Sequence, residues 1–331
     1  MNPELDASLK GKSFLVTGGA GFIGSHIVER LLNAGAKVVA VDDLSNGKLV
    51  NLPAGNGRLE YVQRDVRVFE FESLGKIDGI FNEAARALVP SFIDPVTDLA
   101  VNTGGTIRIL EYARKYDIKV VHASSGSIYG NPVKIPIADD HPLNPISPYG
   151  ASKLASEVYC SMYHREYGLD VTMLRYFNVY GPRQSVNEEM GVIPIFVNRA
   201  LRGDALRIFG DGKQTRDFLN VFDVVRANLL AYGSERGAGR TMNIGGGGFE
   251  ISILDLAEEV MRLCDFHAPL IFAEPKPGDI RRLVADNTVA RETIGYVPSV
   301  SLESGLQEYI KYARSQQPQR PSTAAGSGLP R

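Results

Sequence analysis

The chain has 331 residues, of which 44% are hydrophobic and 22% are charged, and its formal net charge at pH 7 is −2. This composition is typical of a globular protein with a large core, and the mixed charges without a long basic run argue against a nucleic-acid-binding surface. The two cysteines, Cys160 and Cys264, have no paired spacing, which favours a reducing, cytoplasmic environment over a disulfide framework. No stretch approaches the roughly 20 apolar residues of a membrane span, and Met1–Gly11 lacks the apolar core of a signal peptide.

Short apolar, β-branched runs alternate with helical patterns along the first half of the chain. The predicted strands are Ser13–Thr17, Lys37–Val41, Leu59–Gln63, Gly79–Asn82, Lys119–Ser124 and Val171–Tyr176. The main predicted helices are Phe22–Asn33, Asp98–Tyr116 and Pro148–Tyr167. Strand and helix in alternation predict an α/β fold with a doubly wound parallel sheet of the Rossmann type.

After Tyr176 the pattern changes to loops punctuated by Gly and Pro, with shorter helices. We therefore expect a large domain of residues 1–176, completed by a helix near 221–233, and a smaller α/β substrate-binding lobe made discontinuously by 177–314. The lobe should cover the carboxyl ends of the strands, where ligands of such sheets bind. Residues 315–331, rich in Gln, Pro, Ser, Ala and Gly, are expected to be a disordered tail.

The first chemical signal is Thr17-Gly18-Gly19-Ala20-Gly21-Phe22-Ile23-Gly24, between the first strand and the first helix. Gly18 and Gly21 let the backbone turn sharply and approach a pyrophosphate at the helix N-terminus, and Gly24 lets helix and strand pack closely. The second strand ends at Asp42-Asp43, where a carboxylate accepts hydrogen bonds from ribose hydroxyls and repels a 2′-phosphate. The large domain is therefore predicted to bind NAD rather than NADP.

The second signal is Tyr149-Gly150-Ala151-Ser152-Lys153, preceded by Ser147 as a helix cap and Pro148 at the first turn. Tyr149 and Lys153 then share one helix face, where the lysine ammonium and a cationic nicotinamide would lower the pKa of the tyrosine and make it a base. The serine run Ser124–Gly130 follows another strand, and its hydroxyls could bind a reacting oxygen of the substrate. Alone, these patterns also fit a surface helix and a serine-rich loop; together they indicate an acid/base site.

These motifs, in this order, resemble the extended short-chain dehydrogenase/reductase family of nucleotide-sugar epimerases, dehydratases and decarboxylases. Further matching stretches are Arg64–Val66, Asn82–Arg86, Arg175–Arg183 and Phe209–Phe218. The resemblance implies NAD as cofactor and Ser125, Tyr149 and Lys153 as catalytic residues. The cofactor-binding residues that it implies are Gly18, Gly21, Phe22, Ile23, Gly24, Asp42, Asp43, Asn46, Asp65, Val66, Ala84, Ala85, Asn102, Tyr149 and Lys153.

The resemblance also implies a binding site for a uridine diphosphate (UDP) sugar. The implied substrate-binding residues are Arg86, Ser127, Asn178, Gly191, Val192, Ile208, Phe209, Arg216, Lys276, Asp279 and Leu283. Asn178 and Arg216 are expected at the diphosphate, since a guanidinium forks onto phosphate oxygens. Lys276 stands where many relatives have an arginine, so the charge is kept and the fork is lost.

Two positions indicate which family reaction to expect. Family dehydratases carry an Asp-Glu pair directly after the active hydroxyl, and UDP-glucuronate decarboxylases carry a glutamate two positions after it, whereas Gly126 and Ser127 stand here. Epimerisation at C4 needs only a base, a hydride carrier and room for the sugar to turn. We expect NAD-dependent 4-epimerisation of UDP-glucose and UDP-galactose, and of at least some of the N-acetylated pair, through a transient 4-keto intermediate. A dehydratase or decarboxylase, or an NAD-binding module without turnover, stays open.

Three further expectations concern specificity, assembly and metals. By resemblance Leu283 borders the sugar and acts as a gate, where a tyrosine would restrict the pocket to plain hexoses; the alternative is a residue that only packs in the core. The helices Asp98–Tyr116 and Pro148–Tyr167 resemble those that join family subunits into a homodimer through a four-helix bundle. No metal site is expected, because the five histidines are scattered: His26, His122, His141, His164 and His267.

Overall fold

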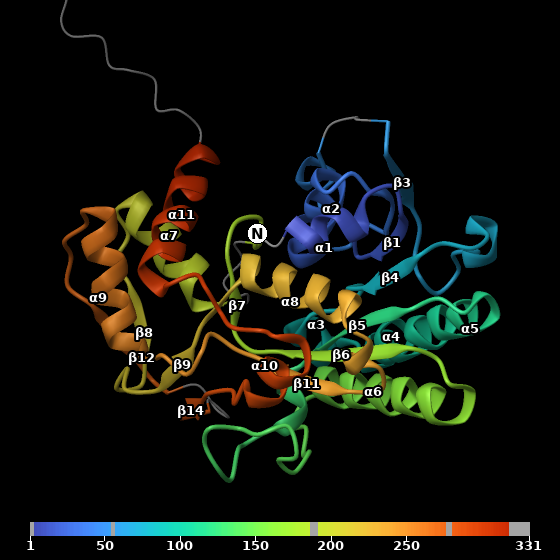
Figure 1. The fold of residues 1–331 in the computed structure, drawn as a ribbon. Coiled ribbons are helices and arrows are strands. Elements are labelled where there is room, and N and C mark those ends of the chain that lie inside the picture. The colour runs from blue at the N-terminus through green and yellow to red at the C-terminus, as the bar shows by residue number, and fades with distance from the viewer. Residues whose placement is uncertain (1–2, 54–56, 186–190, 276–279, 318–331) are drawn as a thin grey trace, which may run out of the picture.

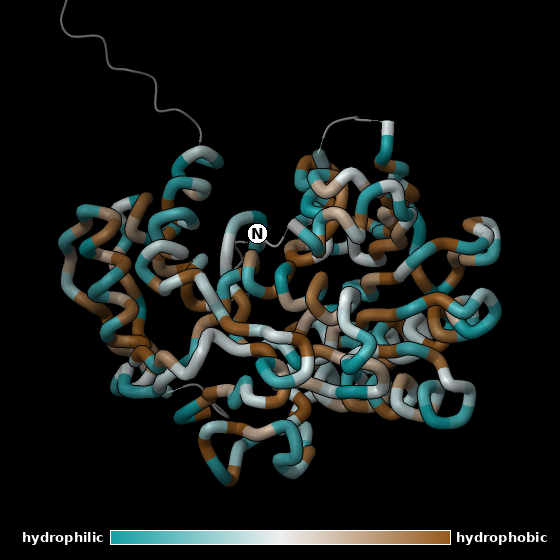
Figure 2. Tube along the Cα trace, in the orientation of Figure 1, coloured by the Kyte–Doolittle hydropathy of each residue, from teal (hydrophilic) through white to brown (hydrophobic). Residues whose placement is uncertain are grey.

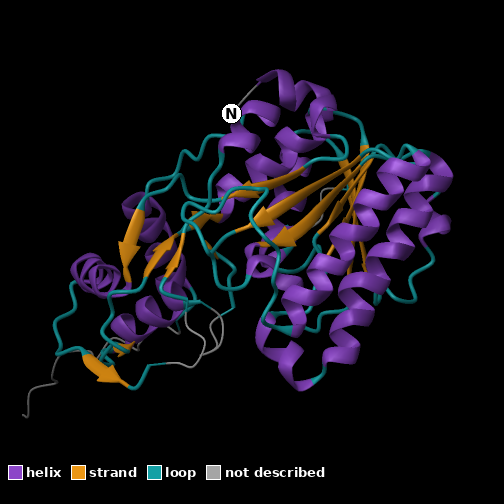
Figure 3. Cartoon of the chain, turned by 90° about the horizontal axis from the view of Figure 1, so that it is seen from below, coloured by secondary structure: helices purple, strands orange, loops and turns teal. Residues whose placement is uncertain are grey.

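The computed structural model describes residues 3–53, 57–185, 191–275 and 280–317, which form a large lobe around one sheet and a smaller lobe beside it (Figures 1 and 3). All neighbouring strands of the large sheet are parallel, and their order is β11-β6-β5-β4-β1-β2-β3. The strands are β1 Ser13–Thr17, β2 Lys37–Asp42, β3 Leu59–Gln63, β4 Gly79–Asn82, β5 Val120–Ser125, β6 Val171–Tyr176 and β11 Thr241–Ile244. The predicted doubly wound parallel sheet is confirmed, and each of its six predicted strands is present within one residue at either end.

The seventh strand, β11, corrects the predicted division of the chain. Residues 241–244 were assigned to the smaller lobe, but Thr241–Ile244 pairs with Met173–Tyr176 of β6 and extends the large sheet. The strand is only four residues long and alternates polar and apolar side chains, so it has no apolar run that would mark a buried parallel strand. The chain therefore returns to the large lobe after it has passed through the small one.

Helices cover both faces of the sheet because successive strand residues point to opposite sides. Phe14 and Val16 of β1 pack in a core with α2 (Phe22–Asn33), α8 (Val221–Gly233) and α10 (Thr288–Ile294). Leu15 of the same strand packs on the other side with α5 (Thr106–Tyr116) and α6 (Pro148–Tyr167). The hydrophobic parts of the tube accordingly run through the central strands, and hydrophilic stretches gather at the outer turns (Figure 2).

The predicted helix Asp98–Tyr116 has a different structure from the one expected. It starts earlier, as α4 (Pro95–Leu99), where the Asp94 side chain accepts a hydrogen bond of 3.0 Å from the amide of Thr97. A π-helical segment, Ala100–Gly105, then precedes α5. Such segments are rare and are frequently found at functional sites. Gly105 lies so close to Val66 that a Cβ on the glycine would come within 2.8 Å of the valine side chain.

In the described part of the chain the smaller lobe has its own core and three small sheets. Its helices are α7 Val192–Arg202, α9 Ile253–Cys264 and α11 Leu302–Ser315, which bury a shared apolar cluster. Strand β7 (Val179–Tyr180) pairs with β10 (Leu219–Asn220), and β8 (Arg207–Phe209) pairs with β13 (Ile271–Ala273). The third sheet places β9 (Thr215–Asp217) between β12 (Glu250–Ser252) and β14 (Arg282–Leu283).

The remaining features of the fold are the chain ends and the two cysteines. A short helix, α1 (Pro3–Leu9), precedes β1, and another, α3 (Leu88–Ile93), precedes α4. Ser315, the first residue of the predicted tail, is the last residue of α11, and residues 318–331 lie outside the described residues. Cys160 and Cys264 are free and buried. Within the described ranges, no helix has both the length and the apolar character needed to cross a membrane.

Candidate active site

The glycine motif forms the turn between β1 and α2. Gly18 has a φ of 63°, which a side chain would strain, and a Cβ on Gly24 would clash with the carbonyl oxygen of Gly18. Among the described residues no side chain caps α2 at Gly21, so the first amides of the helix are available to an anionic ligand. The turn therefore has the shape and polarity expected for binding a pyrophosphate.

A cavity opens beside this turn and brings most of the predicted cofactor residues together. The predicted residues that line it are Gly18, Gly21, Phe22, Ile23, Gly24, Asp42, Asp43, Asn46, Asp65, Val66, Ala84 and Ala85. Arg86, which was expected to contact the substrate, lines the same cavity. Arg67, Glu83, Thr97 and Val101 also line it and were not predicted.

Two carboxylates in this cavity are held by defined donors. Asp42 accepts hydrogen bonds from the amides of Ala20 (3.0 Å) and Leu44 (2.8 Å). Because a carboxylate has about four acceptor positions, these two bonds leave capacity for ribose hydroxyls. Asp65 accepts from the guanidinium of Arg67, whose Nε lies 2.9 Å from Oδ2, and this contact lowers the pKa of Asp65. The free helix amides and the carboxylates at the ends of β2 and β3 make the cavity a good fit for NAD.

Asn102 lies behind the wall of the cavity and does not line it. Its Oδ1 accepts a hydrogen bond from the amide of Arg86 (2.8 Å), and its Nδ2 donates to Asp98 Oδ1 (3.0 Å) and to Ser152 Oγ (2.9 Å). Asp98, Asn102 and Ser152 are all buried. The structure therefore gives Asn102, which the resemblance placed at the cofactor, a role in joining the π-helical segment, α6 and the backbone of Arg86.

The three predicted catalytic residues come together at the carboxyl end of β5. Ser147 caps α6 by accepting a hydrogen bond from the amide of Gly150 (3.0 Å), as predicted, and Tyr149 and Lys153 stand one turn apart on that helix. Ser125, the last residue of β5, forms a hydrogen bond with Tyr149 that lowers the pKa of the phenol. The Ser125 hydroxyl also lies 3.1 Å from the hydroxyl of Ser127, which was predicted to bind the substrate.

Burial is the largest influence on the pKa of both Tyr149 and Lys153. Burial raises the pKa of Tyr149 to about 12, and burial lowers the pKa of Lys153, which is only 2% exposed, to about 8. The lowering of the pKa of Tyr149 by the lysine ammonium and a cationic nicotinamide stays a prediction.

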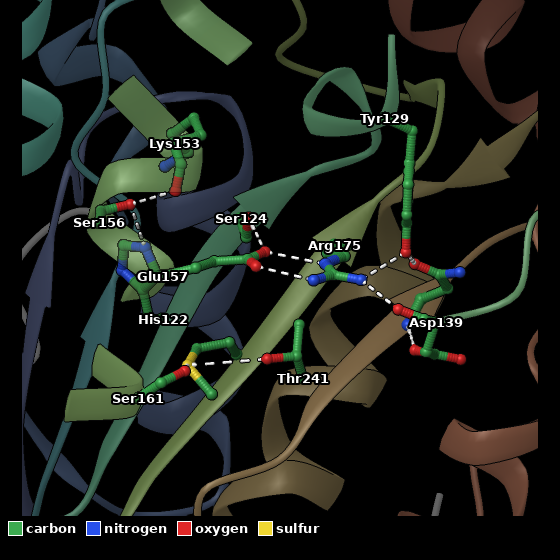
Figure 4. A network of polar contacts seen from close by, with 12 residues as sticks. His122, Ser124, Tyr129, Asp139, Lys153, Ser156, Glu157, Ser161, Arg175 and Thr241 are labelled. Carbon is green, nitrogen blue, oxygen red and sulfur yellow. Dashed lines mark hydrogen bonds and ion pairs between the residues drawn. The ribbon is translucent and has the colours of Figure 1, made fainter. Parts of the chain in front are cut away.

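Behind α6 lies a buried ion pair that the motifs did not reveal (Figure 4). Arg175 of β6 and Glu157 of α6 are 6% and 5% exposed, with Nε to Oε1 at 2.9 Å and a second nitrogen to Oε2 at 2.8 Å. Ser124 donates to the same carboxylate, and Arg175 also donates to the hydroxyl of Tyr129 and to the carbonyl of Asp139 (2.8 Å). The ion pair thus ties α6 to β6 and to the segment after β5.

A second chain of polar contacts runs beneath Lys153 (Figure 4). His122 of β5 lies 3.0 Å from Asn82 Nδ2 and 3.0 Å from the hydroxyl of Ser156, which donates to the carbonyl of Lys153 (2.7 Å). Burial holds the pKa of His122 well below its ordinary value, so the imidazole is neutral. We interpret this contact chain as support for the backbone of α6. In the described ranges no three His, Cys, Asp or Glu side chains form a group that could hold a metal ion.

A second cavity lies in the smaller lobe. It is lined by five of the predicted substrate residues, Asn178, Gly191, Val192, Phe209 and Arg216, and also by Gln184, Arg207, Gln214 and Phe218, which were not predicted. Ile208 does not line this cavity but is fully buried in the core of the lobe. Leu283 packs against a buried cluster that includes Ile128, the residue after Ser127. Lys276 and Asp279 lie outside the described residues.

The parallel sheet, the glycine turn and the Ser-Tyr-Lys group define an α/β protein of the dinucleotide-dependent class. The chain belongs to the NAD dependent epimerase/dehydratase family, whose profile matches residues 14–245.

Relatives and solved structures support this assignment along nearly the whole chain. UDP-glucose 4-epimerase of Mycolicibacterium smegmatis is 42% identical over 309 residues, which cover 91% of this chain and 98% of the relative. The crystal structure of UDP-glucose 4-epimerase from Thermotoga maritima with UDP-glucose superimposes with a TM-score of 0.87 at 40% identity, covering 92% of this chain and 99% of that chain. UDP-glucuronic acid 4-epimerase from Bacillus cereus, in complex with UDP-glucuronic acid and NAD, has a TM-score of 0.85 at 31% identity, with 92% and 99% covered.

Proposed function

We propose that the protein is an NAD-dependent isomerase that epimerises a UDP-sugar at C4 through a transient 4-keto intermediate. The observation that carries the proposal is the grouping of Ser125, Tyr149 and Lys153 at the carboxyl edge of the sheet that also forms the glycine turn. UDP-glucose and UDP-galactose are the expected substrates, in keeping with the named activities of the similar proteins.

The side chains divide the work between proton transfer and anchoring. Tyr149 takes the proton from the sugar 4-hydroxyl and returns it at the end of the cycle, while Ser125 holds the same oxygen. NAD, when bound, supplies the hydride acceptor and donor that interconverts the C4 alcohol and ketone. Arg216 and Asn178 hold the diphosphate in the cavity of the smaller lobe, so the sugar can present its other face without leaving the protein. We assign the NAD site to the large lobe and the nucleotide-sugar site to the smaller lobe.

The absence of an added acid favours epimerisation over the other family reactions. Gly126 and Ser127 occupy the positions where dehydratases and decarboxylases carry their extra carboxylates, and the Ser127 hydroxyl is engaged with Ser125. Product analysis by mass spectrometry and NMR, over a panel of nucleotide sugars, tests this. An epimer of unchanged mass supports the proposal; loss of water or carbon dioxide supports a dehydratase or decarboxylase, and no conversion with bound NAD supports a binding module.

Leu283 is proposed to limit the range of sugars. It packs beside the segment that follows Ser127, where an apolar wall could lie against the methyl of an N-acetyl group without leaving a polar group unpaired. On this basis the enzyme accepts at least some of the N-acetylated substrates as well as the plain hexoses. The same packing also suits the alternative, a residue that only fills the core, so a variant is needed to decide.

We also propose that the enzyme is a cytoplasmic homodimer. Leu99, Val158 and Tyr159 lie on α4 and α6 with exposed fractions of 52%, 58% and 39%, which is the apolar surface that an isologous four-helix contact would cover. Both cysteines are free thiols, the form that a reducing compartment maintains. Light scattering at micromolar concentration tests the assembly: a mass of two chains supports the dimer, and a mass of one chain excludes it.

A further inference from the structure

A small apolar cluster connects α6 to the strand that carries Leu283. Its buried members are Ile128, Tyr129, Ile137, Phe177 and Ala285. Leu283 of β14 packs against this cluster, and so does Leu154 of α6, the residue after Lys153. The position of Leu283 relative to the acid/base group therefore depends on how firmly the cluster is held.

The backbone of Ile137, between β5 and α6, fixes the residues that follow β14. Its amide donates to the carbonyl of Val284 (2.8 Å), and its carbonyl accepts from the amide of Asp286 (2.9 Å). The two bonds form a parallel bridge between Ile137 and Ala285. Leu283, which precedes Val284, is therefore fixed against the large lobe through Ile137.

Asn243 of β11 holds two members of the cluster at once. Its side chain is buried, and Oδ1 accepts a hydrogen bond from the hydroxyl of Tyr129 (2.7 Å) while Nδ2 donates to the carbonyl of Ile137 (2.9 Å). Its own amide donates to the carboxylate of Asp139 (2.6 Å). Because the Tyr129 hydroxyl also accepts from Arg175, these bonds extend the ion-pair network of Figure 4 to the bridge beside β14.

We propose that Asn243 is a positioning residue that holds Leu283, as one wall of the sugar pocket, in place relative to the acid/base group and thereby limits which sugars are accepted. The inference rests on the proposed function and on the proposed role of Leu283. Leu283 pairs in register with Arg216 of β9, the residue proposed to hold the diphosphate, so a sugar attached to that diphosphate would lie near this wall. Because Asn243 is 0% exposed, it acts on the sugar only through the residues that it holds.

Leucine at position 243 would have nearly the same shape as asparagine and no group that forms hydrogen bonds. In Asn243→Leu the hydroxyl of Tyr129 loses its acceptor, and the carbonyl of Ile137 keeps the amide of Asp286 as its partner. The wall is then held less firmly and yields more easily to the larger N-acetylated sugar. The nucleotide end of the substrate, which is assigned to the separate cavity of the smaller lobe, should not be affected.

The test compares kcat/KM for UDP-glucose and UDP-N-acetylglucosamine in Asn243→Leu and in wild type. The ratio should shift by about threefold or more toward the N-acetylated sugar, while the Kd of UDP, which carries no sugar, stays unchanged. Asn198→Leu is the matched control, because Asn198 of α7 donates to the carbonyl of Pro194 (2.9 Å) and lies outside the cluster. An equal loss on both sugars in Asn243→Leu, or the same shift in Asn198→Leu, overturns the proposal.

A second variant and a double-mutant cycle complete the test. Tyr129→Phe removes one hydroxyl and keeps the ring in the cluster, so it should shift the ratio in the same direction even where Asn243→Leu does not fold. When Asn243→Leu is combined with Leu283→Tyr, the effect on the ratio should differ from the product of the two separate effects, and effects that simply multiply overturn the proposal. If wild type converts no UDP-sugar, the proposed function fails, and the ratio of the two Kd values for these UDP-sugars in the same variants still decides the role of Asn243.

Discussion

Replacing Arg175 by methionine removes one partner of the buried ion pair and leaves the other in place. Among the described residues Glu157, which is 5% exposed, would keep only the hydroxyl of Ser124 as a partner, so its carboxylate would be uncompensated in the protein interior. Breaking such a pair costs about 3–5 kcal/mol of stability. Each kcal/mol of lost stability lowers the melting temperature of a somewhat smaller protein by about 2–4 °C, so the melting temperature should fall by about 6–20 °C.

The assay is urea unfolding at neutral pH, followed by circular dichroism, as a double-mutant cycle. Arg175→Met/Glu157→Gln carries no buried charge and should recover at least about 1 kcal/mol relative to Arg175→Met alone. Arg262→Met is the control, since Arg262 is 58% exposed in its pair with Glu259 and such pairs contribute about 0–1 kcal/mol. A loss below about 1 kcal/mol in Arg175→Met, or a double variant as unstable as the sum of the single variants, would refute the reasoning.

The other predictions address the chemistry, the cofactor, the sugar and pH. Tyr149→Phe should lower turnover at least about 10²-fold with unchanged unfolding, and near-normal turnover would exclude Tyr149 as the base. Asp42→Ala should weaken NAD binding in calorimetry and relax the preference over NADP; unchanged selectivity would mean that another residue discriminates. Leu283→Tyr should shift the kcat/KM ratio between plain and N-acetylated sugars by about 10-fold, or about 1.4 kcal/mol, whereas equal losses would identify a packing residue. Burial raises the pKa of Glu83 from 4.5 to about 7, so its neutral form stabilises the fold at low pH, and this stabilisation is lost as the pH rises from about 4.5 to about 7. Glu83→Gln should therefore flatten the melting-temperature profile between these two pH values. An unchanged slope would contradict this prediction.

The large sheet could be predicted because its signal is local. Runs such as Val38–Val41 and Val171–Leu174 are apolar and β-branched, as strands buried on both faces must be. Strand β11 was missed because its four residues include Thr241 and Asn243. The π-helical segment was missed because helical periodicity does not distinguish a local widening of one turn from a regular helix.

The candidate site was predictable only where the motif itself carries the chemistry. Tyr149 and Lys153 are one helical turn apart, and the glycines are adjacent in sequence, so spacing alone predicts their geometry. Glu83 and Tyr176 meet through a hydrogen bond between residues 93 positions apart, and no periodicity connects them. The same distance in sequence explains why the effect of burial on Lys153 could not be foreseen: it depends on the side chains that several strands and helices bring around the amine.

The late return of the chain to the large sheet limits where this protein can be truncated or recombined with a relative. The smaller lobe begins after β6, but β11 completes the sheet only at Thr241–Ile244, and α10 joins its helical cover later still. A truncation after Tyr176 would expose β6 as an edge strand, which invites aggregation. During synthesis the seventh strand cannot join the sheet until residue 244 has left the ribosome. Chimeras that exchange the smaller lobe with that of a relative therefore need a junction after β6 and one on each side of this return, rather than a single crossover point.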